Sequence, residues 1–455
     1  MEPSLNEIEQ ICKKEIEQQY EKHLESAKVA QDYLEHSTAK YKGKTIYSLY
    51  IPKILNTQTT AMLKETAETM VRIMRKVIKE YLDNESYRSL FGFDCHLKEL
   101  ILQHPGYENL LPVARVDTFL NEQDHTFKFC EFNTDGSSAM NEDRELCNAF
   151  TRTQLYKTLN ETYTLGSFEL FDSLVEGFLQ NYATYENRVE NPSVAIVDFL
   201  ELGCSLEEFE FFRASFEKAG CKAYGCDIRE MTFDGEHLYT KDGEVIDLVY
   251  RRAVTSDILE HEKEVEDFIK AVTEKKVCCM GNFCTQVAHD KSLFYILRDK
   301  QTKQILTDEE NAFVEAHIPF TVPLTDHTIK QYKILEEREK WLIKPKNSYG
   351  ARGIFAGVNF SEKDWKKAVR ENRNKNYILQ EFIMPYQTQN IDFHKKNPCF
   401  ASYSNLTGLY VYNGKFAGVY SRQAKHEIIS SSYDENDIAT ITLKKKDDES
   451  KIRER

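Results

Sequence analysis

The chain has 455 residues, and a hydrophobic content of 41% is enough for a packed core spread over two to four domains or one multi-lobed enzyme. The 60 lysine and arginine residues face 74 aspartate and glutamate residues, giving a net charge of −14 and arguing against a nucleic-acid partner. No apolar run approaches the roughly 20 residues of a membrane-spanning helix, so we expect no membrane association. The acidic N-terminus lacks a signal-peptide core, which favours a cytoplasmic protein whose eleven cysteines are reduced structural thiols.

The N-terminal part of the chain has mostly helical patterning. Residues 4–37 carry apolar side chains near helical spacing, and Ser4 with Glu7 could form a capping box at the start. A second amphipathic helix is predicted over about 59–83, where its apolar stripe belongs to a core. No arrangement of cysteine and histidine typical of a thiol hydrolase precedes residue 110.

Residues 113–138 contain the stretch with the most chemical information. Polar and apolar residues alternate in 114–120 and again in 128–133, and the linking NEQDH is rich in turn formers, so we expect a β-hairpin. Four polar residues would share one sheet face: Arg115, Asp117, Glu131 and Asn133. Two carboxylates and an amide oxygen suit Mg²⁺, and an arginine suits a phosphate or an oxyanion. A solvated sheet face with ordinary ion pairing fits the hairpin equally well.

The middle of the chain predicts a separate small domain. Residues 141–185 are mostly helical in pattern, and Asn191-Pro192 marks a boundary. A buried strand at 193–200, a helix at 207–220 and strands near 221–228 and 244–252 follow, an order typical of parallel α/β pairing. The Arg251-Arg252 pair at the end of the last strand could bind an anion or form salt bridges.

The last third contains candidate nucleotide-binding segments. Residues 287–299 are interpreted as a strand end leading into a helix. Residues 341–357 predict two strands around a glycine-containing loop, 376–383 an apolar strand, and 406–423 a hairpin turning at Asn413-Gly414. Lys344 at a strand end, followed by that loop, could place an ammonium group and backbone N–H groups against polyphosphate, although an ordinary hairpin explains it too. From about residue 431 the chain becomes a polar tail, which we expect to be a surface strand or a frayed end.

Taken together and in order, these motifs resemble those of the ATP-grasp ligases over about residues 110–425. The order resembles the circularly permuted branch, specifically the synthetase domain of glutathionylspermidine synthase and, more distantly, the eukaryotic glutathione synthetases. The likeness rests on five segments: Arg115-Val-Asp117 with Glu131-Phe-Asn133, Asp290-Lys291-Ser292, Lys344-Pro345 with the loop 349–353, Gln380-Glu381, and the strand ending at Arg422. The YGARG loop is shorter and more basic than that family leads us to expect.

The resemblance implies an α/β (α+β) fold of the circularly permuted ATP-grasp type. The implied organisation is a helical N-terminal region with the metal-binding hairpin (1–190), a small α/β substrate-binding domain (191–285), nucleotide-binding lobes (286–430) and a polar C-terminal tail (431–455). Because the residues before 110 look helical and lack a Cys/His constellation, we expect no amidase activity.

The resemblance also implies an activity and a set of roles. The activity is that of an ADP-forming ligase that joins a small-molecule or peptide carboxylate to an amine through an acyl phosphate. The implied roles are as follows: Arg115 is catalytic; Asp117, Glu131 and Asn133 hold two Mg²⁺ ions; Lys291, Lys344, Gly350, Gly353, Gln380, Glu381 and Ile383 bind ATP; Ser138 and Arg422 contact substrate or phosphate. The alternatives are a kinase on the same scaffold and a nucleotide-binding protein without turnover.

Overall fold

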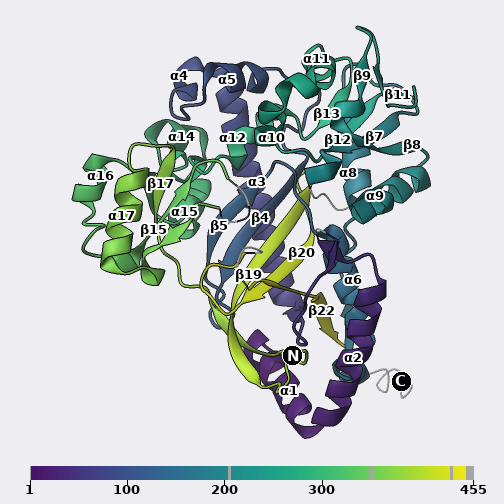
Figure 1. Cartoon of the computed structure of the whole chain (residues 1–455), viewed down its shortest axis with the longest axis vertical. Helices are drawn as coiled ribbons and strands as arrows, with labels where there is room; N and C mark the ends of the chain where they lie inside the picture. Colours follow the sequence, from purple (N-terminus) through teal and green to yellow (C-terminus); the bar gives the residue numbers. More distant parts are fainter. Residues whose placement is uncertain are drawn as a thin grey trace, which may run out of the picture.

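A six-stranded antiparallel sheet forms the centre of the molecule (Figure 1). The computed structural model describes residues 2–41, 43–202, 206–348, 350, 352–430 and 434–446. The strand order is β21-β20-β19-β4-β5, with β18 pairing on β19. The strands are β4 (Val113–Leu120), β5 (Phe127–Asn133), β18 (Gln387–Ile391), β19 (Phe400–Tyr412), β20 (Lys415–Ala424) and β21 (Asn436–Ile438).

The predicted hairpin at 113–133 is confirmed as β4 and β5. The two strands pair antiparallel, with Arg115 opposite Asn133 and Asp117 opposite Glu131, and their register shifts just after Asp117. One face of the sheet packs on the long helix α3 (Thr57–Asp83), which lies behind it in Figure 1. Apolar residues of β4 such as Val116 join the core there, so the polar residues that alternate with them face the other side.

The second predicted hairpin, β19 and β20, is also confirmed. Asn413 and Gly414 occupy the turn with φ of 47° and 82°, the pair of positive values that a two-residue type I′ turn requires. β19 pairs with β4 on its other side, so residues near 407–412 lie beside residues 113–118. This pairing brings Arg422 of β20 to the same sheet as Arg115 and Asp117.

The small α/β domain lies above the central sheet on the right in Figure 1. Its four strands are all parallel, in the order β13-β12-β7-β8, as the strand–helix–strand pattern predicted. They are β7 (Ser193–Asp198), β8 (Lys222–Asp227), β12 (Leu248–Arg251) and β13 (Cys278–Met280), with α9 (Leu206–Lys218) connecting β7 to β8. A ribbon of β9 (Thr232–Phe233), β10 (Leu238–Tyr239) and β11 (Val245–Ile246) is attached, and Asp242-Gly243 lies in the turn between β10 and β11.

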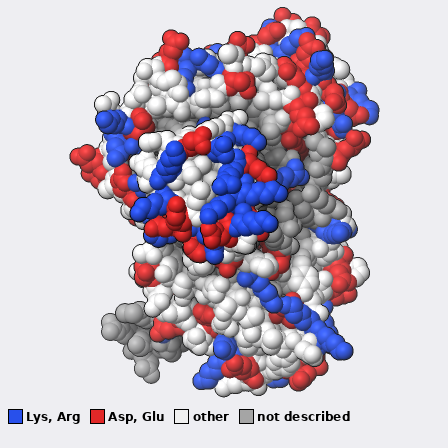
Figure 2. Space-filling model, turned by 60° about the vertical axis from the view of Figure 1, so that its left-hand side comes forward, with Lys and Arg blue, Asp and Glu red and all other residues white. Residues whose placement is uncertain are grey.

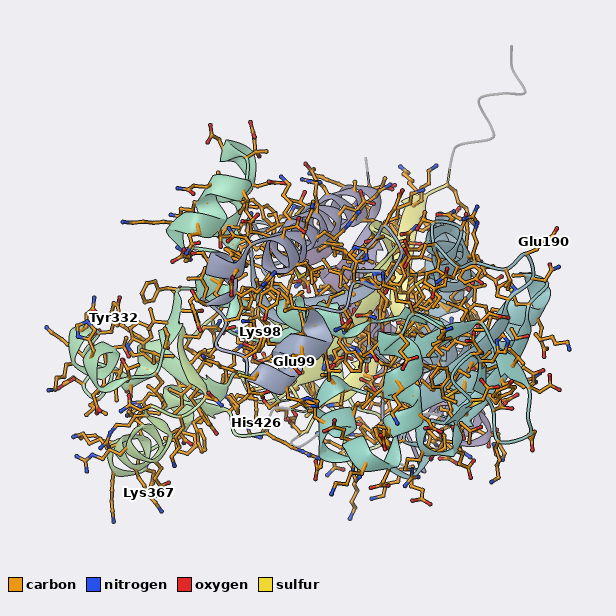
Figure 3. All side chains as sticks on the ribbon, turned by 90° about the horizontal axis from the view of Figure 1, so that it is seen from above. Lys98, Glu99, Glu190, Tyr332, Lys367 and His426 are labelled. Atoms are coloured by element: carbon orange, nitrogen blue, oxygen red, sulfur yellow. The ribbon has the colours of Figure 1, made fainter. Side chains whose placement is uncertain are left out.

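A lobe formed by residues 319–383 projects to the other side of the molecule. Its sheet has the order β14-β17-β15-β16, made of β14 (Thr321–Pro323), β15 (Trp341–Pro345), β16 (Phe355–Ala356) and β17 (Tyr377–Glu381). The helices α16 (Asp326–Gln331) and α17 (Glu362–Asn372) accompany this sheet, and Trp365 of α17 is fully buried in its core. Seen from above, Tyr332 and Lys367 mark the far end of the lobe, and Glu190 lies at the opposite end of the molecule (Figure 3).

The lobe carries a surplus of positive charge although the whole chain is acidic. Residues 319–383 contain 13 lysine and arginine residues against 8 aspartate and glutamate residues. Figure 2 shows basic side chains gathered over the face of the molecule on which this lobe comes forward. A locally positive lobe is compatible with an anionic ligand in spite of the overall charge.

The N-terminal helices and the C-terminal strand form a third region. The predicted helical segment 4–37 is two helices, α1 (Leu5–Gln18) and α2 (Tyr20–His36), and the capping box of Ser4 and Glu7 is present. Of the two predictions for the polar tail, a surface strand or a frayed end, its described part is a strand: β22 (Thr440–Lys445) lies between β3 (Lys53–Asn56) and β6 (Tyr163–Gly166) in a three-stranded sheet. Ile441 and Leu443 of β22 are buried, which fixes the strand in the core.

Two further segments complete the helical framework. The stretch 141–185 contains α6 (Met140–Phe150), α7 (Gln154–Thr162) and α8 (Asp172–Tyr182), interrupted by β6. The helix predicted within 287–299 is present as α13 (Leu293–Ile296), but the strand end predicted before it is instead a short helix, α12 (Gln286–His289). The apolar residues of both helices pack into the core around α3. Among the described residues, no helix is long and apolar enough to cross a membrane, and the ten described cysteines are free.

Candidate active site

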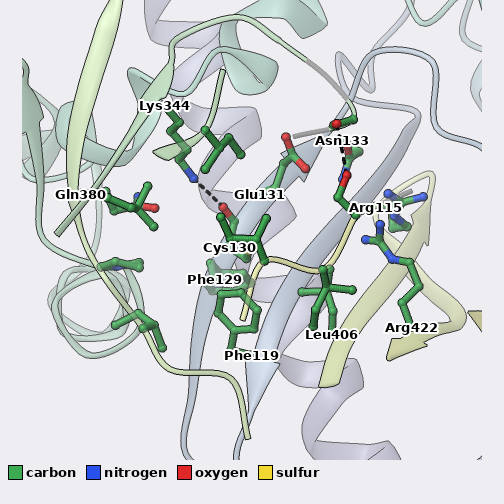
Figure 4. A pocket seen from close by; sticks show the side chains of 18 of the residues that line it. Arg115, Phe119, Phe129, Cys130, Glu131, Asn133, Lys344, Gln380, Leu406 and Arg422 are labelled. Carbon is green, nitrogen blue, oxygen red and sulfur yellow. Dashed lines mark hydrogen bonds between the residues drawn. The ribbon is translucent and has the colours of Figure 1, made fainter. Parts of the chain in front are cut away.

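The largest group of predicted site residues lines one cavity between the lobe and the central sheet (Figure 4). The cavity has a volume of about 290 Å³. Its walls come from the β4–β5 hairpin, the turn 135–138, strands β15 and β17 of the lobe, and the segment 427–430. Ten of the thirteen predicted residues line it: Arg115, Glu131, Asn133, Ser138, Lys344, Gly350, Gln380, Glu381, Ile383 and Arg422.

Two arginines share one buried carboxylate on the floor of this cavity. Arg115 Nε donates to Asp117 Oδ1 at 2.8 Å, and Arg422 Nη2 donates to Asp117 Oδ2 at 2.6 Å. The side chain of Asp117 is 1% exposed, so both ion pairs are largely removed from water. Asn133 Nδ2 also donates to Asp117 Oδ2, at 3.2 Å, which leaves its amide oxygen for the cavity. Asp117 thus orients two guanidinium groups and one amide.

A lysine pair from distant segments meets the other carboxylate of the hairpin. Lys291 Nζ lies 2.9 Å from Glu131 Oε1 and donates to the carbonyl of Ser348 at 2.7 Å. Burial raises the pKa of Glu131, yet Lys291 and Lys344 lower it to about 2, so this carboxylate is ionised. Lys344 Nζ donates to the carbonyl of Cys130 at 3.0 Å. Burial lowers the pKa of Lys344, with Lys291 acting in the same direction, to about 8.

The turn that follows β5 is joined to the small α/β domain by a buried ion pair and a hydrogen bond. Asp135 Oδ1 lies 2.7 Å from Arg251 Nη2, with both side chains 1% exposed, and Asp135 also accepts from the backbone N–H of Thr255 at 2.7 Å. Gly136 has a φ of 72°, and a Cβ there would lie 2.5 Å from the carbonyl oxygen of Arg252. Only glycine fits this contact without displacing backbone.

The Arg251-Arg252 pair therefore forms buried ion pairs, and neither residue lines the cavity. Arg252 Nη1 lies 2.6 Å from Glu208 Oε1 of α9, just as Arg251 pairs with Asp135. Of the two roles that the sequence left open, the structure favours salt bridging. The partners are buried structural groups rather than surface residues.

The Ser138 backbone is held in place by the groups around it. Its carbonyl accepts from Arg115 Nη1 at 3.1 Å and from the Tyr410 hydroxyl at 2.6 Å. Ala139, which precedes α6, has a φ of 82°, an unusual value for a residue with a side chain. The turn thus presents Ser138 at the cavity wall in a fixed backbone geometry.

The two predicted loop glycines are placed differently. Gly350 lines the cavity, and its carbonyl accepts a hydrogen bond from Ser430 at 3.2 Å. Gly353 does not line it; a Cβ at Gly353 would lie 2.7 Å from the Tyr377 hydroxyl, so this glycine allows close packing within the lobe. Two residues of the predicted loop motif, Tyr349 and Ala351, lie outside the described residues.

The lobe end of the cavity combines apolar walls with a polar strand end. Leu342 of β15 contributes apolar surface there, and Phe119 and Leu406 contribute it from the central sheet. Gln380, Glu381 and Ile383 line the same end, at the point where β17 leaves the lobe for the central sheet. A flat apolar ring with a polar edge suits such walls.

Sequence reasoning missed three residues at the site. His289 lines the cavity and is buried, and its Nδ1 has no hydrogen-bond partner among the described residues. Asp135 and Glu435 also line it, and Glu435 Oε2 lies 3.5 Å from Arg422 Nη1. No sequence signal identified them, because their partners lie far away along the chain.

A group of buried carboxylates lies next to Arg422. Burial and the neighbouring Glu435 raise the pKa of Asp437 to about 7, and its carboxylate accepts a hydrogen bond from Tyr420. Burial also raises the pKa of Glu142 and of Asp143 well above their ordinary values. One oxygen of each of these last two carboxylates has no partner among the described residues.

The hairpin residues fit a magnesium ion held mainly by substrate phosphates. Among the described residues, no group of three or more His, Cys, Asp or Glu side chains could hold a metal ion. Mg²⁺ requires few protein ligands when phosphate oxygens complete its octahedron, and the Glu131 carboxylate and Asn133 amide oxygen both line the cavity. Asp117 fits less well than the sequence predicted, because both of its oxygens already accept from guanidinium groups.

A search of solved structures finds a protein with a similar fold over nearly the whole chain. A glutathione synthetase-like effector from Globodera pallida, in apo form, is 12% identical, covers 92% of this chain and 96% of its own, and has a TM-score of 0.64. This chain shares that fold. The predicted α/β (α+β) fold class is therefore confirmed, whereas the ATP-grasp assignment, the circular permutation and the specific likeness to glutathionylspermidine synthase stay predictions.

The other comparisons add little. A proposed gamma-glutamylcysteine synthetase from Methylobacillus flagellatus is 10% identical, with coverage of 83% of this chain and 85% of that one and a TM-score of 0.39. D-cycloserine synthetase is 12% identical, with coverage of 57% and 77% and a TM-score of 0.34. These TM-scores are too low for either structure to support an argument about this chain. No family model and no curated protein matches the sequence.

Proposed function

We propose that this protein is an ADP-forming, ATP-dependent ligase that joins a carboxylate to an amine through an acyl phosphate. The proposal includes the circularly permuted ATP-grasp arrangement and a likeness to glutathionylspermidine synthase. One observation carries it: a buried lysine, two arginines and an ionised glutamate line a single cavity whose other end is apolar, and a second buried lysine, Lys291, pairs with that glutamate. A nucleotide would place its base at the apolar end and its phosphates among the cations.

The phosphate end of the site would be formed by Lys291 and Lys344. Both side chains are buried, and among the described residues Lys344 has no carboxylate within ion-pair distance. A buried ammonium group without a counter-charge is costly, and a phosphate would supply that charge. Lys291 would exchange its contact with Glu131 for a phosphate oxygen. Gly350, on the segment that covers this end, would close over the terminal phosphate and keep water out.

Glu131 and Asn133 would hold Mg²⁺, which would supply positive charge to neutralise the substrate phosphates. Asp117 would act mainly by aiming Arg115 and Arg422 at the reacting groups. Its participation as a third ligand would require it to give up one guanidinium contact. The number of ions, two in the sequence-based expectation, is part of this proposal.

The reaction proceeds in two balanced steps. A carboxylate oxygen of the first substrate attacks the γ-phosphorus, and the bond to the β-phosphate oxygen breaks to release ADP. The amine nitrogen then attacks the acyl carbon, inorganic phosphate leaves with the former carboxylate oxygen, and the nitrogen releases one proton to give the neutral amide. Arg115, within the cavity and fixed by Asp117, would stabilise the charge on the acyl phosphate and on the tetrahedral oxyanion.

The substrates would bind near the turn and the buried acids. Ser138 and Arg422 would contact the carboxylate substrate. The carboxylates beside Arg422, among them Glu435 and Asp437, would favour an amine that carries positive charge before it reacts. Free cysteines and the use of ATP suit the cytoplasm as the place where this chemistry occurs.

A screen of carboxylate and amine pairs, beginning with γ-glutamyl peptides and polyamines, tests the proposal. ADP release should require both substrates and Mg²⁺, and mass spectrometry should find a product joined by an amide. Glu131→Gln protein purified in the same way controls for a contaminating ATPase. ADP release without amine, accompanied by a stable phosphorylated acceptor, would instead identify a kinase.

A further inference from the structure

His289 lines the cavity beside the turn 135–138 and takes no part in the ion pairs described above. It ends the helix α12, whose Val287 and Ala288 are fully buried in the core around α3, so its backbone position is fixed. The residue is 7% exposed, and its Nδ1 has no hydrogen-bond partner among the described residues. No carboxylate of that part of the chain lies within 4.0 Å of either ring nitrogen. A buried imidazole at a cavity wall with an unused nitrogen is available to a bound ligand.

The charges around His289 leave it neutral and would stabilise the charge that it gains on protonation. Burial lowers its pKa below the ordinary imidazole value of about 6.5, and Lys291 acts in the same direction. Three carboxylates act in the opposite direction: Asp135 on the turn, Glu131 on β5 and Asp290 next to it in the chain. At neutral pH the imidazole is therefore in its basic form, and an imidazolium formed during a reaction would be stabilised by these three neighbours.

The second step of the proposed reaction requires a proton acceptor, because the amine nitrogen loses a proton as the amide forms. The two arginines of the cavity floor are already protonated. Burial raises the pKa of Glu131, but the neighbouring lysines lower it to about 2, so this carboxylate is a weak base. Burial likewise raises the pKa of Asp135, and Arg251 lowers it below the ordinary value. His289 is a stronger base than either of these carboxylates, and it lines the same wall with a nitrogen to spare.

We propose that His289 is a catalytic residue, the general base that accepts the proton of the attacking amine. This inference rests on the proposed function, because it takes the reaction to pass through an acyl phosphate. As the amine nitrogen bonds to the acyl carbon, the bond from that carbon to the phosphate oxygen breaks, and its electron pair leaves with inorganic phosphate. The N–H proton passes to the ring nitrogen that faces the amine and is released to solvent with the product. Ser138, which would contact the carboxylate substrate, lines the same cavity.

The two steps of the reaction should depend on His289 to different extents. In the first step an ionised carboxylate attacks phosphorus, and no proton is transferred. In the second step a positioned base typically contributes a factor of about 100 to 10,000 to the rate. Loss of His289 should therefore slow amide formation and leave acyl phosphate formation nearly unchanged.

The test follows each step by rapid quench on the full-length protein with Mg²⁺. A burst of ADP from ATP and a carboxylate without amine reports the first step, with glutathione as the first carboxylate probe, and amine added afterwards reports the second. His289→Asn and His289→Gln should keep the burst rate within about twofold and lower the amide rate at least about 100-fold. His317→Asn is the matched control, because it replaces a histidine stacked on Phe127 outside this cavity, and it should leave both rates unchanged. Thermal unfolding of each variant confirms that it is folded.

Chemical rescue distinguishes a base from a residue that only fills space. His289→Ala would leave room at the cavity wall for added imidazole, which should raise the amide rate in proportion to its concentration. Rates with substituted imidazoles should increase with their basicity, as general base catalysis requires. In the wild type, kcat at saturating amine should fall as the pH drops through the lowered pKa of His289, whereas the ADP burst should not.

Each outcome bears on the inference. An equal fall of the burst and amide rates in His289→Asn would assign the residue a structural role and overturn the inference. Amide formation at the wild-type rate would show that the leaving phosphate takes the proton, and the proposed ligase reaction would remain. A wild-type kcat that stays constant through the ionisation of imidazole would overturn the inference even if no variant folds. Absence of an ADP burst with every carboxylate of the screen would overturn the proposed function and this inference with it.

Discussion

The two sides of the cavity differ in how their charges are balanced. On the floor, Arg115, Asp117 and Arg422 neutralise each other within one sheet, and Glu435 adds a further carboxylate to Arg422. On the lobe side, Lys344 donates to the backbone carbonyl of Cys130 and lies 5.0 Å from the centre of the Phe294 ring. Lys291 pairs with Glu131, and no other acid of the described residues lies within ion-pair distance of either lysine. The floor is a self-contained ionic cluster, whereas the lobe side has an excess of buried positive charge.

This difference assigns separate tasks to the two sides. A cluster that satisfies its own charges holds its geometry without a ligand and suits the orientation of a reacting group. A buried lysine with a lowered pKa is stabilised when an anion arrives, so the lobe side suits ligand binding. Variants on the floor should therefore reduce turnover more than nucleotide affinity, and variants on the lobe side should do the reverse.

Glu131→Gln should have the largest effect, because this residue connects the two sides. Loss of the carboxylate removes a proposed Mg²⁺ ligand and leaves Lys291 buried without its counter-charge. We expect Mg²⁺-dependent ADP formation to fall at least about 1,000-fold, with a folded protein of lower thermal stability. Glu427→Gln, which alters another carboxylate at the cavity wall outside the ion-pair cluster, provides a matched control. Turnover of Glu131→Gln at the wild-type level would show that this carboxylate is not a ligand.

Arg115→Ala should come next and act on turnover. If the guanidinium stabilises charge that develops during the reaction, kcat should fall by about 100- to 1,000-fold with little change in the KM for ATP. Arg115→Lys should restore little activity, since a single ammonium cannot contact Asp117 and the reacting group in one planar fork. A large rise in KM with an unchanged kcat would place Arg115 in substrate binding instead.

Gly136→Ala tests whether the close contact between the turn after β5 and the small α/β domain stabilises the folded protein. The added methyl group would meet the carbonyl of Arg252, and the residue would keep a positive φ, so we expect a loss of about 2–4 kcal/mol in the free energy of unfolding. Gly220→Ala is the matched control: its φ is also positive, at 91°, but nothing lies within 4 Å of the added Cβ. That control should lose about 1 kcal/mol. If denaturant titrations show that both variants lose the same free energy of unfolding, the contact at Gly136 does not contribute to stability.

The smallest effect concerns the pH dependence of nucleotide binding. The pKa of Lys344 is lowered to about 8 in the folded protein, and phosphate favours its charged form, so binding should take up a proton above that pH. ATP affinity should fall by about fivefold from pH 8 to pH 9, as the protonated fraction of Lys344 falls from about one half to about one eleventh. Protein stability should change in the opposite direction to ATP affinity. Between pH 8 and 10.5 Lys344 is more protonated in the unfolded chain than in the folded protein, so its contribution to the free energy of unfolding increases as pH rises. Lys344→Arg should bind ATP with a flat profile, and an unchanged slope in that variant would implicate another group.

Local patterns were sufficient to predict the two hairpins. Alternation in 113–133 and the Asn413-Gly414 turn depend on neighbours in sequence, and both appear where the sequence placed them. The same local rules failed for β22, whose lysine-rich end looked like a solvent-exposed tail. Its burial depends on pairing with β3 and β6, which lie hundreds of residues earlier.

The site was predictable as a set of chemical groups but not as a set of contacts. The ligand-like oxygens and the cations were visible from their spacing, yet Asp117 was assigned to a metal although it pairs with Arg422, 305 positions away. Arg251 likewise looked like an anion site because its partner, Asp135, belongs to another part of the chain. Which charged residues neutralise each other depends on how distant segments are brought together in the fold. The spacing of residues in the sequence does not show it.

Oxygen transfer from substrate to phosphate tests the central claim most directly. The carboxylate substrate found in the screen would be labelled with oxygen-18 and incubated with ATP, the amine and Mg²⁺, and the inorganic phosphate would be analysed by mass spectrometry. Reaction through an acyl phosphate predicts that each phosphate released carries one labelled oxygen, in equal amount to the amide formed. Amide formation with unlabelled phosphate would contradict the account.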